Sequence, residues 1–326
     1  MKKYFTYRHV YLLGTLLLCC SLNACSPKFI NINNSSATSA QIASPATNNN
    51  ITPTDSLEVA QDVLKVKGKT ITLKDTKDDI EKKLGMPNRV VDTEYDFDYY
   101  VYNNNYKKLV FIAIANDKVV GFYTDSIDFN FNGIVSGSSL KTVNQVLGTT
   151  FAMDDVLTQR TKEYTVDILM DKLGTGQVTG IYILANSVKE DGFTDSINRN
   201  IELLNFDLTN SVRARNNVPV LSWSSSAAAS SRKHSADMAD YNFFNHIDPN
   251  GRTPGNRMNA EGISYTSCGE NIIAGYGTSI LSNHAWYNSE GHRKNMLNPN
   301  YRYLGVGFSY DAKSTYKTYI TQNYYR

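Results

Sequence analysis

Histidine and glutamate side chains gather between residues 234 and 292, and nothing upstream offers a comparable cluster. Imidazole and carboxylate are the groups that hold divalent metals or exchange protons near neutral pH. The cluster therefore predicts that a functional site lies in the C-terminal part of this 326-residue chain. The candidate site residues in it are His234, His246, Glu270, His284, Glu290 and His292.

Five short motifs follow one another through and beyond this stretch. They are HSADMADYNFFNH (234–246), DPNGRTPGNRM, CGENI (268–272), AWYNSEGHRKNML (285–297) and YLGVGFSY (303–310). Any one of them alone would be weak, but the ordered set resembles the CAP superfamily, also called SCP or PR-1, in its bacterial secreted form. The resemblance covers about residues 196–326 and implies an α-β-α sandwich there. The helix and strand pattern is compatible with that fold.

The resemblance also implies a cleft lined by two histidines and two acids, which in the family can hold a divalent metal such as zinc. By motif, the first histidine corresponds to His246 at the end of FFNH, the first acid to Glu270 of GEN, and the second histidine to His292 of GHR. Glu270 could then be a metal ligand, an acceptor that orients a histidine, or a base that deprotonates a bound water. The sequence leaves these three roles open.

The fourth member of the cleft is ambiguous. Plant and animal members of the family place the second acid three residues after the tryptophan, and here that position is Ser289. Glu290 is the next residue and lies one helical turn beyond Trp286. Either its carboxylate reaches the cleft, or it is a solvated charge at a helix end and only three members remain.

The other reactive residues have plainer interpretations. His234 lies beside the small-residue stripe of a helix expected at 224–240, where it is either a buried, hydrogen-bonded histidine or a site residue. His284 falls outside the family's tetrad and is expected to be structural or on the surface. Cys268 is expected to be a small buried thiol rather than a nucleophile. The chain has no Gly-x-Ser-x-Gly elbow and no His-Glu-x-x-His pair.

Residues 57–187 are predicted to form a smaller α+β domain with a two-fold internal repeat. A short helix at 72–85 is ended by Gly85 and Pro87, and residues 138–148 repeat that form. The domain resembles the one commonly found N-terminal to bacterial CAP modules. It has no His and no Cys, which favours binding or spacing over chemistry. Strands are expected at 99–102, 108–114, 119–123, 164–169 and 178–184.

A polar link is predicted at 186–199, before the second domain (196–326). Ile201, Leu204, Leu208 and Val212 then recur at helical spacing and predict its first helix. Residues 303–310 and 316–322 alternate with period two, which predicts a closing hairpin with a loop at 311–315.

Residues 1–25 read as an export leader, with a positive start and an apolar run at 10–20 that is too short to span a bilayer. The end of the leader, residues 22–25, resembles a lipobox. Cys25 would then be lipidated and would anchor the protein to the outer face of the cell membrane, whereas ordinary Sec cleavage would leave it without a lipid. Residues 26–56 are rich in Asn, Ser, Thr, Ala and Pro, which predicts a disordered linker.

Charge and cysteine usage limit the partners and the covalent bonds that this protein can have. The 33 Lys and Arg nearly balance the 31 Asp and Glu, which argues against a nucleic-acid partner. Three of the four cysteines lie in the leader, so Cys268 is the only thiol of the folded body and no internal disulfide can form there.

Three functions remain. The first is an exported, membrane-tethered binding module whose cleft takes an envelope ligand, such as a lipid, a peptide or a cell-wall fragment, with or without a divalent metal. The second is a metal-dependent hydrolase of peptide or cell-wall substrates, with His246 and His292 on the metal and Glu270 as the base. The third is a structural protein of envelope or spore assembly. The family resemblance favours the binding module, because most members have no settled catalytic activity.

Overall fold

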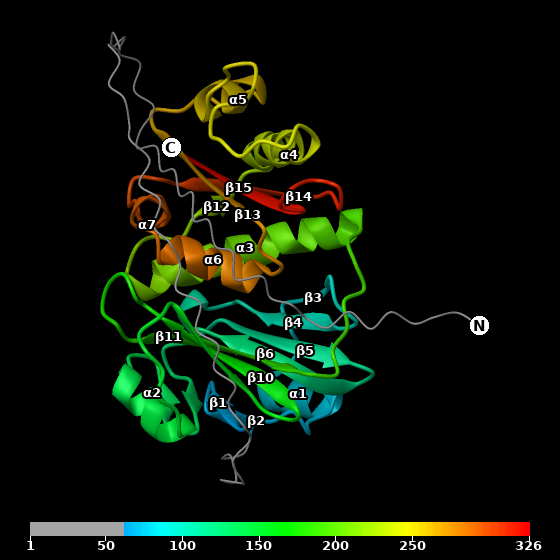
Figure 1. Ribbon diagram of the computed structural model, residues 1–326, viewed down its shortest axis with the longest axis vertical. Helices are drawn as coiled ribbons and strands as arrows, with labels where there is room; N and C mark the ends of the chain where they lie inside the picture. Colours follow the sequence, from blue (N-terminus) through cyan, green and yellow to red (C-terminus); the bar gives the residue numbers. More distant parts are fainter. Residues whose placement is uncertain (1–61) are drawn as a thin grey trace, which may run out of the picture.

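The computed structural model describes residues 62–326. The predicted leader, the lipobox at Cys25 and the linker at 26–56 lie outside the described residues. Within 62–326 the chain is a mixed α and β structure built as a stack of layers (Figure 1).

The N-terminal domain is organised around a seven-stranded antiparallel sheet with the order β3-β4-β5-β6-β11-β10-β9. A second, four-stranded sheet, β2-β1-β7-β8, lies against one of its faces together with α1 and α2 (Figure 1). The elements are β1 (Leu64–Val66), β2 (Lys69–Ile71), α1 (Lys77–Leu84), β3 (Arg89–Asp92), β4 (Asp98–Tyr102), the 3-10 helix η1 (Tyr106–Lys108), β5 (Val110–Ala115), β6 (Lys118–Thr124), β7 (Asn130–Phe131), β8 (Ile134–Val135), α2 (Leu140–Leu147), β9 (Val156–Arg160), β10 (Tyr164–Met170) and β11 (Val178–Ala185).

The predicted α+β class, both helices and all five expected strands of this domain are confirmed. The first helix begins later than expected, at Lys77, because Thr76 is its N-cap and forms a capping box with Asp79. Sequence patterning did not find β1, β2, β3, β7, β8 and β9, most of which have only two to four residues and are too short to show a period. The two-fold repeat stays a prediction.

The C-terminal domain is an α-β-α sandwich, as expected. Its sheet has the order β12-β14-β15-β13, so β13 is an edge strand. α4 packs on β14 and β15 from one face and carries α5 with it, whereas α3 covers the other face together with α6 and α7 (Figure 1). The elements are α3 (Asp195–Arg215), β12 (Ser222–Trp223), α4 (Ser225–Asp240), α5 (Pro254–Ala260), β13 (Cys268–Ala274), α6 (Ser279–Tyr287), α7 (Glu290–Met296), β14 (Tyr303–Tyr310) and β15 (Thr318–Tyr325).

The predicted polar link is shorter than expected. Thr194 accepts a hydrogen bond from the backbone N–H of Ile197, and this cap starts α3 at Asp195, so the last five residues assigned to the link are helical. The connection between the domains therefore runs only from β11 to Thr194.

The two domains share an apolar core. Leu204 and Leu208 of α3 and Ile280 of α6 pack on the face of the seven-stranded sheet that α1 and α2 leave open. Both faces of that sheet are thereby covered, and α3 lies between two sheets (Figure 1). The residues of the N-terminal domain in this shared core are Val91, Phe97, Tyr99, Val101, Leu109, Phe111, Ala113, Tyr123, Leu169 and Tyr182.

A buried carboxylate on α3 adds polar contacts to the same interface. Asp207, only 1% exposed, accepts hydrogen bonds from Asn103 and Tyr106 at 2.9 Å each and forms an ion pair with Arg89. Each of the three donors belongs to the N-terminal domain. The charge of Asp207 is therefore compensated only when the domains are docked.

Two glycines let α4 approach the sheet closely. A Cβ at Gly305 would lie 2.0 Å from the backbone nitrogen of Ala228, and one at Gly307 would lie 2.1 Å from that of Arg232. Both positions are in β14, directly beneath α4. The glycine pair thus fixes the height of the helix that carries His234 above the sheet.

The variant Gly305→Ala should destabilise the fold by about 3 kcal/mol, because backbone atoms of α4 cannot make room for the methyl group without moving the helix. Gly277→Ala is the matched control, since a Cβ there meets nothing within 4 Å. We expect it to stay within about 0.5 kcal/mol of the wild type. Urea unfolding of the three proteins measures the difference, and equal midpoints would contradict the close packing.

His284 predicts a pH dependence of stability. Burial lowers its pKa from 6.5 to about 4, although its bond to the carbonyl of Asp155 acts in the other direction. Between pH 6.5 and 4 the unfolded chain therefore binds a proton at His284 that the native state does not bind. The contribution of the neutral, buried His284 to stability is complete above pH 6.5 and is lost as the pH falls toward 4. The contribution should fall by up to about 1.4 kcal/mol per pH unit.

The variant His284→Gln isolates this effect, because an amide can still donate to the Asp155 carbonyl but does not titrate. As the pH is lowered from 6.5 to 4, the unfolding free energy of the wild type should fall more steeply than that of the variant. A difference that is constant with pH would show that His284 titrates normally.

Candidate functional site

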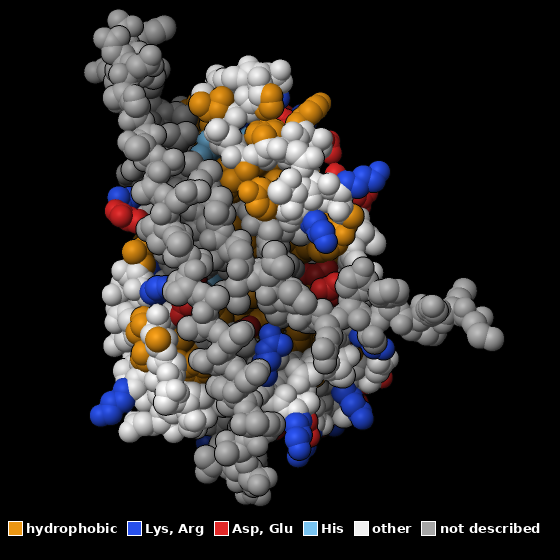
Figure 2. Space-filling model, viewed as in Figure 1, with side chains coloured by type: hydrophobic (Ala, Val, Ile, Leu, Met, Phe, Trp, Pro, Cys, Tyr) orange, Lys and Arg blue, Asp and Glu red, His pale blue; other side chains and the backbone are white. Residues whose placement is uncertain are grey.

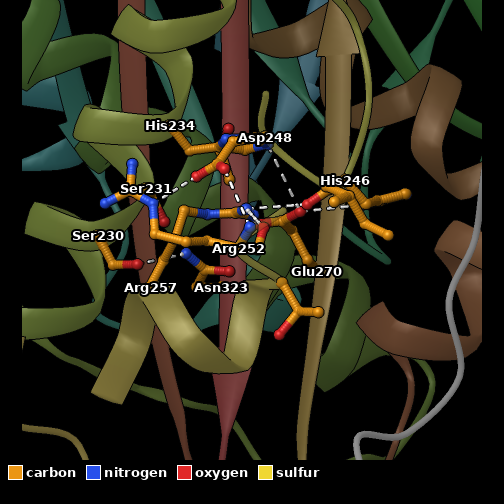
Figure 3. A network of polar contacts seen from close by, with 12 residues as sticks. Ser230, Ser231, His234, His246, Asp248, Arg252, Arg257, Glu270 and Asn323 are labelled. Carbon is orange, nitrogen blue, oxygen red and sulfur yellow. Dashed lines mark hydrogen bonds and ion pairs between the residues drawn. The ribbon is translucent and has the colours of Figure 1, made fainter. Parts of the chain in front are cut away.

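The site is built around Glu270 on the edge strand β13. The side chain is fully buried, and each carboxylate oxygen has its own partner (Figure 3). Oε1 lies 2.9 Å from Nδ1 of His246, and Oε2 accepts a hydrogen bond from Nη2 of Arg257 at 2.6 Å. This three-residue group is the strongest concentration of buried charge at the predicted cleft.

Arg257 holds the loop that carries His246. Its helix, α5, starts with a capping box at Thr253 and a proline at the first position. From there the guanidinium reaches inward, and Nη1 donates to the backbone carbonyls of His246 and Arg252 at 2.9 Å each. One side chain thus fastens the loop after α4 to β13.

The surroundings keep Glu270 ionised. Burial by itself would raise the pKa of the carboxyl group, but the hydrogen bond from His246, the neighbouring imidazole of His234 and the charge of Arg257 outweigh it. The net effect holds the pKa below its ordinary value of 4.5. Glu270 is therefore an anion over the whole neutral range.

His234 on α4 belongs to the same cluster. Its Nε2 lies 3.0 Å from the carbonyl oxygen of Asn245 and 3.8 Å from Oε1 of Glu270 (Figure 3). Burial lowers its pKa to about 4, so the ring is neutral and its Nε2–H donates to the carbonyl. Nδ1 then carries a lone pair, and it has no hydrogen-bond partner within residues 62–326. The expectation of a buried, hydrogen-bonded histidine is confirmed, and the structure also places it beside the acid.

His292 reaches the edge of the sheet from the other side. Asn271 follows Glu270 in β13, so its side chain points to the opposite face. There it donates a hydrogen bond to the backbone carbonyl of His292 at 3.3 Å, while Asn295 of α7 donates to the carbonyl of Glu270 at 3.1 Å. α7 is thereby attached to β13, and the rings of Trp286 and His292 meet edge to face at 6.4 Å.

The remaining cleft candidates lie differently. Glu290 at the start of α7 is exposed and pairs with Lys294 of the same helix at 2.8 Å. Its carboxylate does not join the group around Glu270. Ser289 is half-buried at the N-cap of α7 and makes no capping hydrogen bond.

Two further residues are structural. His284 is buried and binds the backbone carbonyl of Asp155 through Nε2 at 2.9 Å, which makes it part of the contact between domains. Cys268 is a buried free thiol that packs with Ala227, Met258 and Ile263, as expected for a small apolar residue.

The donor set limits how a metal could be held. Within residues 62–326 there is no group of three or more His, Cys, Asp or Glu side chains arranged to bind a metal ion. Glu270 already uses one oxygen for His246 and the other for Arg257, so it fits the role of an acceptor that orients His246 through Nδ1. A divalent ion would then have the imidazoles of His246 and His292 as its protein ligands. Metal binding by these two residues stays a prediction.

Sequence reasoning missed the role of Arg257. It stands in the motif RTPGNR together with Arg252, and both arginines flank the same helix cap. Arg252 pairs with Asp248 near the surface, whereas Arg257 is only 5% exposed. No pattern near either arginine distinguishes the buried one from the one near the surface.

Comparison with known proteins assigns a family to each domain. Residues 206–324 match the cysteine-rich secretory protein family, CAP, and residues 73–173 match the CAP-associated N-terminal family. These ranges lie inside the two domains predicted from the sequence.

Individual relatives agree with this. The Bacillus subtilis membrane protein YlbC is 28% identical over 289 residues, which cover 76% of this chain and 80% of YlbC. YkwD of the same organism is 43% identical over 102 residues, covering 31% of this chain and 40% of YkwD.

Solved structures show the same architecture. An extracellular protein of Bacillus anthracis that contains an SCP domain superposes with a TM-score of 0.65 at 25% identity, over 78% of this chain and 94% of the other. A cysteine-rich secretory protein of Staphylococcus aureus has the same fold, with a TM-score of 0.62 at 13% identity over 78% and 91% of the two chains. The chain therefore contains a CAP domain of the cysteine-rich secretory protein family, preceded by a CAP-associated N-terminal domain.

Proposed function

We propose that this protein is an exported binding module of the cell envelope, and that its cleft at His246, Glu270 and His292 holds a ligand without turning it over. One observation carries the proposal: both oxygens of Glu270 are committed to protein partners. The carboxylate acts as a support for the loop and for the histidine ring.

Glu270 is poorly suited to the role of a base. A base that activates water needs a free lone pair directed at the water and a pKa near the working pH. Glu270 is hydrogen-bonded at both oxygens, and its pKa lies below 4.5. His246 and Arg257 would have to release it before it could accept a proton. This favours binding over the metal-dependent hydrolase.

The surface beside the cleft supports a ligand with an apolar part. Ile247, next to His246, is 46% exposed, and Tyr241 at the end of α4 is 70% exposed. Figure 2 shows apolar side chains gathered over the region of α4 and α5, with charges of both signs scattered around them. Among the envelope ligands considered, a lipid or an apolar peptide suits this surface better than a highly charged polymer.

Tethering through a lipidated Cys25 completes the proposal. It is supported by the relative YlbC, which is named a membrane protein, and by the extracellular Bacillus anthracis relative. Within residues 62–326 no helix is long and apolar enough to cross a membrane.

The double variant His246→Ala/His292→Ala tests the cleft. Three probes should be applied to the exported chain: Zn²⁺ by calorimetry, phosphatidylglycerol vesicles by flotation, and isolated cell-wall sacculi by sedimentation. We expect the wild type to bind at least one of the three probes and the double variant to bind that probe at least tenfold more weakly, because the proposal makes both imidazoles ligand-binding groups. Glu290→Ala is the control and should bind as the wild type does.

Turnover decides between binder and hydrolase. We expect neither the wild type nor Glu270→Gln to hydrolyse peptides or sacculi above the background rate. Hydrolysis by the wild type that Glu270→Gln abolishes, with the fold intact by circular dichroism, would establish the hydrolase. A double variant that retains all three probes would favour the assembly role.

Cys25→Ser tests the anchor. In cells grown with a labelled fatty acid, the wild type should carry the label and sediment with membranes, whereas the variant should lose the label and appear in the medium. An unlabelled wild type released to the medium would indicate ordinary Sec cleavage.

A further inference from the structure

The N-terminal domain holds the junction between α6 and α7, next to His292. Arg293 follows His292 directly, and its guanidinium forms an ion pair with Asp171 at the end of β10. The same guanidinium donates to the backbone carbonyl of Tyr287 and lies over the ring of Tyr287 at 3.9 Å. A residue of one domain thus fixes the start of α7 in the other.

Asn288 makes a second contact at this junction. Its Nδ2 donates to the carbonyl of Met170 at 3.0 Å, and its Oδ1 accepts the backbone N–H of Leu173 at 3.2 Å. One amide therefore satisfies a donor and an acceptor of the turn after β10. His284, one helical turn earlier, binds the carbonyl of Asp155.

The turn that makes these contacts is itself well ordered by hydrogen bonds. Asp171 Oδ1 accepts the backbone N–H of Gly174, and Oδ2 accepts that of Thr175, each at 2.9 Å. A Cβ at Gly174 would lie 2.5 Å from Oδ2 of Asp171 and 2.8 Å from Nη1 of Arg293, so the turn closes tightly around the ion pair. The acceptor for Arg293 is therefore held in place before the helix docks on it.

α7 needs this external support. It has seven residues, and Ser289 gives it no capping hydrogen bond. A helix of that length is not stable by itself, so its position follows from what it packs against. On one side it is attached to β13 through Asn271 and Asn295, and on the other to the N-terminal domain through Arg293 and Asn288.

We propose that the N-terminal domain positions His292, so that the binding cleft is complete only while Asp171 and the turn after β10 grip the α6–α7 junction. Asp171 and Asn288 are positioning residues, because they act on the cleft through α7. This inference rests on the proposed binding function and adds its regulation: whatever displaces the turn from α7 weakens binding at the cleft.

The histidines provide a direct readout, since only four of them lie within residues 62–326. The exported chain with ¹³C-labelled histidine should give four imidazole signals, assigned through single histidine variants and recorded at pH 7. The test variant is Asp171→Asn, which keeps an oxygen for the turn amides but removes the charge that pairs with Arg293. The control is Lys172→Ala, which only removes an exposed pair with Asp154.

Asp171→Asn should shift or broaden the signal of His292 and leave that of His234 unchanged, whereas Lys172→Ala should leave all four signals in place. A merely stabilising role for Asp171 would lower the melting temperature without moving His292 in the native state. Asn288→Ala removes the second contact with the turn but changes no residue of the turn. It should move the same signal, and it replaces Asp171→Asn if that variant does not fold. An unmoved His292 in the folded variants would overturn the proposal.

Zn²⁺ affinity of the same proteins separates this inference from the proposed function. If the wild type binds Zn²⁺, Asp171→Asn should bind it about tenfold more weakly, and equal affinities would count against positioning. If the wild type does not bind Zn²⁺, only the metal part of the proposed function fails, and the histidine signals still decide whether His292 is positioned from the N-terminal domain.

Discussion

Burial of α3 between two β-sheets is the constraint on which the rest of this structure depends. Ile197, Ile201 and Val212 pack into the core of the CAP domain, whereas Leu204 and Leu208 pack on the seven-stranded sheet of the other domain. A helix that is covered on all sides needs partners for its polar side chains too. α3 has them in both directions, because Asp207 faces donors of the N-terminal domain and Glu202 pairs with Arg232 of α4.

The two domains are not independent units, although a boundary between them can be drawn along the chain. The connecting segment is short and polar, as for a link between independent units, but the shared core and the bonds of Asp207, His284 and Arg293 join the units firmly. Interfaces that bury apolar side chains and ionised groups together resist separation more than polar, wet contacts do. The N-terminal domain is therefore part of the mechanical support of the cleft.

The proposed cleft lies along an edge strand. Because β13 has a neighbour on only one side, loops and helices from both faces of the sheet can reach its backbone and side chains. His246 arrives with the loop after α4, and His292 arrives with α7. Arg257 compensates the buried charge of Glu270, so that the acid stabilises the site instead of titrating in it.

Part of this was readable from the sequence. The spacing of apolar residues predicted α3 and α4, and alternation predicted the long strands, because these elements are long enough to show a period. The five motifs predicted the CAP sandwich and named His246, Glu270 and His292, since residues of a shared site stand in fixed local contexts. The short strands show no period in the sequence. Nothing in the motifs indicates that Arg257, and not Arg252, is the buried partner of Glu270.

The sequence by itself determined the family of each domain and its fold class, and it named the candidate site residues, because these depend on local patterns along the chain. Only the tertiary structure decided that Glu270 is held by Arg257, that Glu290 faces solvent, and that Asp171 reaches across to the helix of His292. Those outcomes depend on contacts between segments as much as 122 residues apart, whose meeting is fixed by packing rather than by any pattern near either residue.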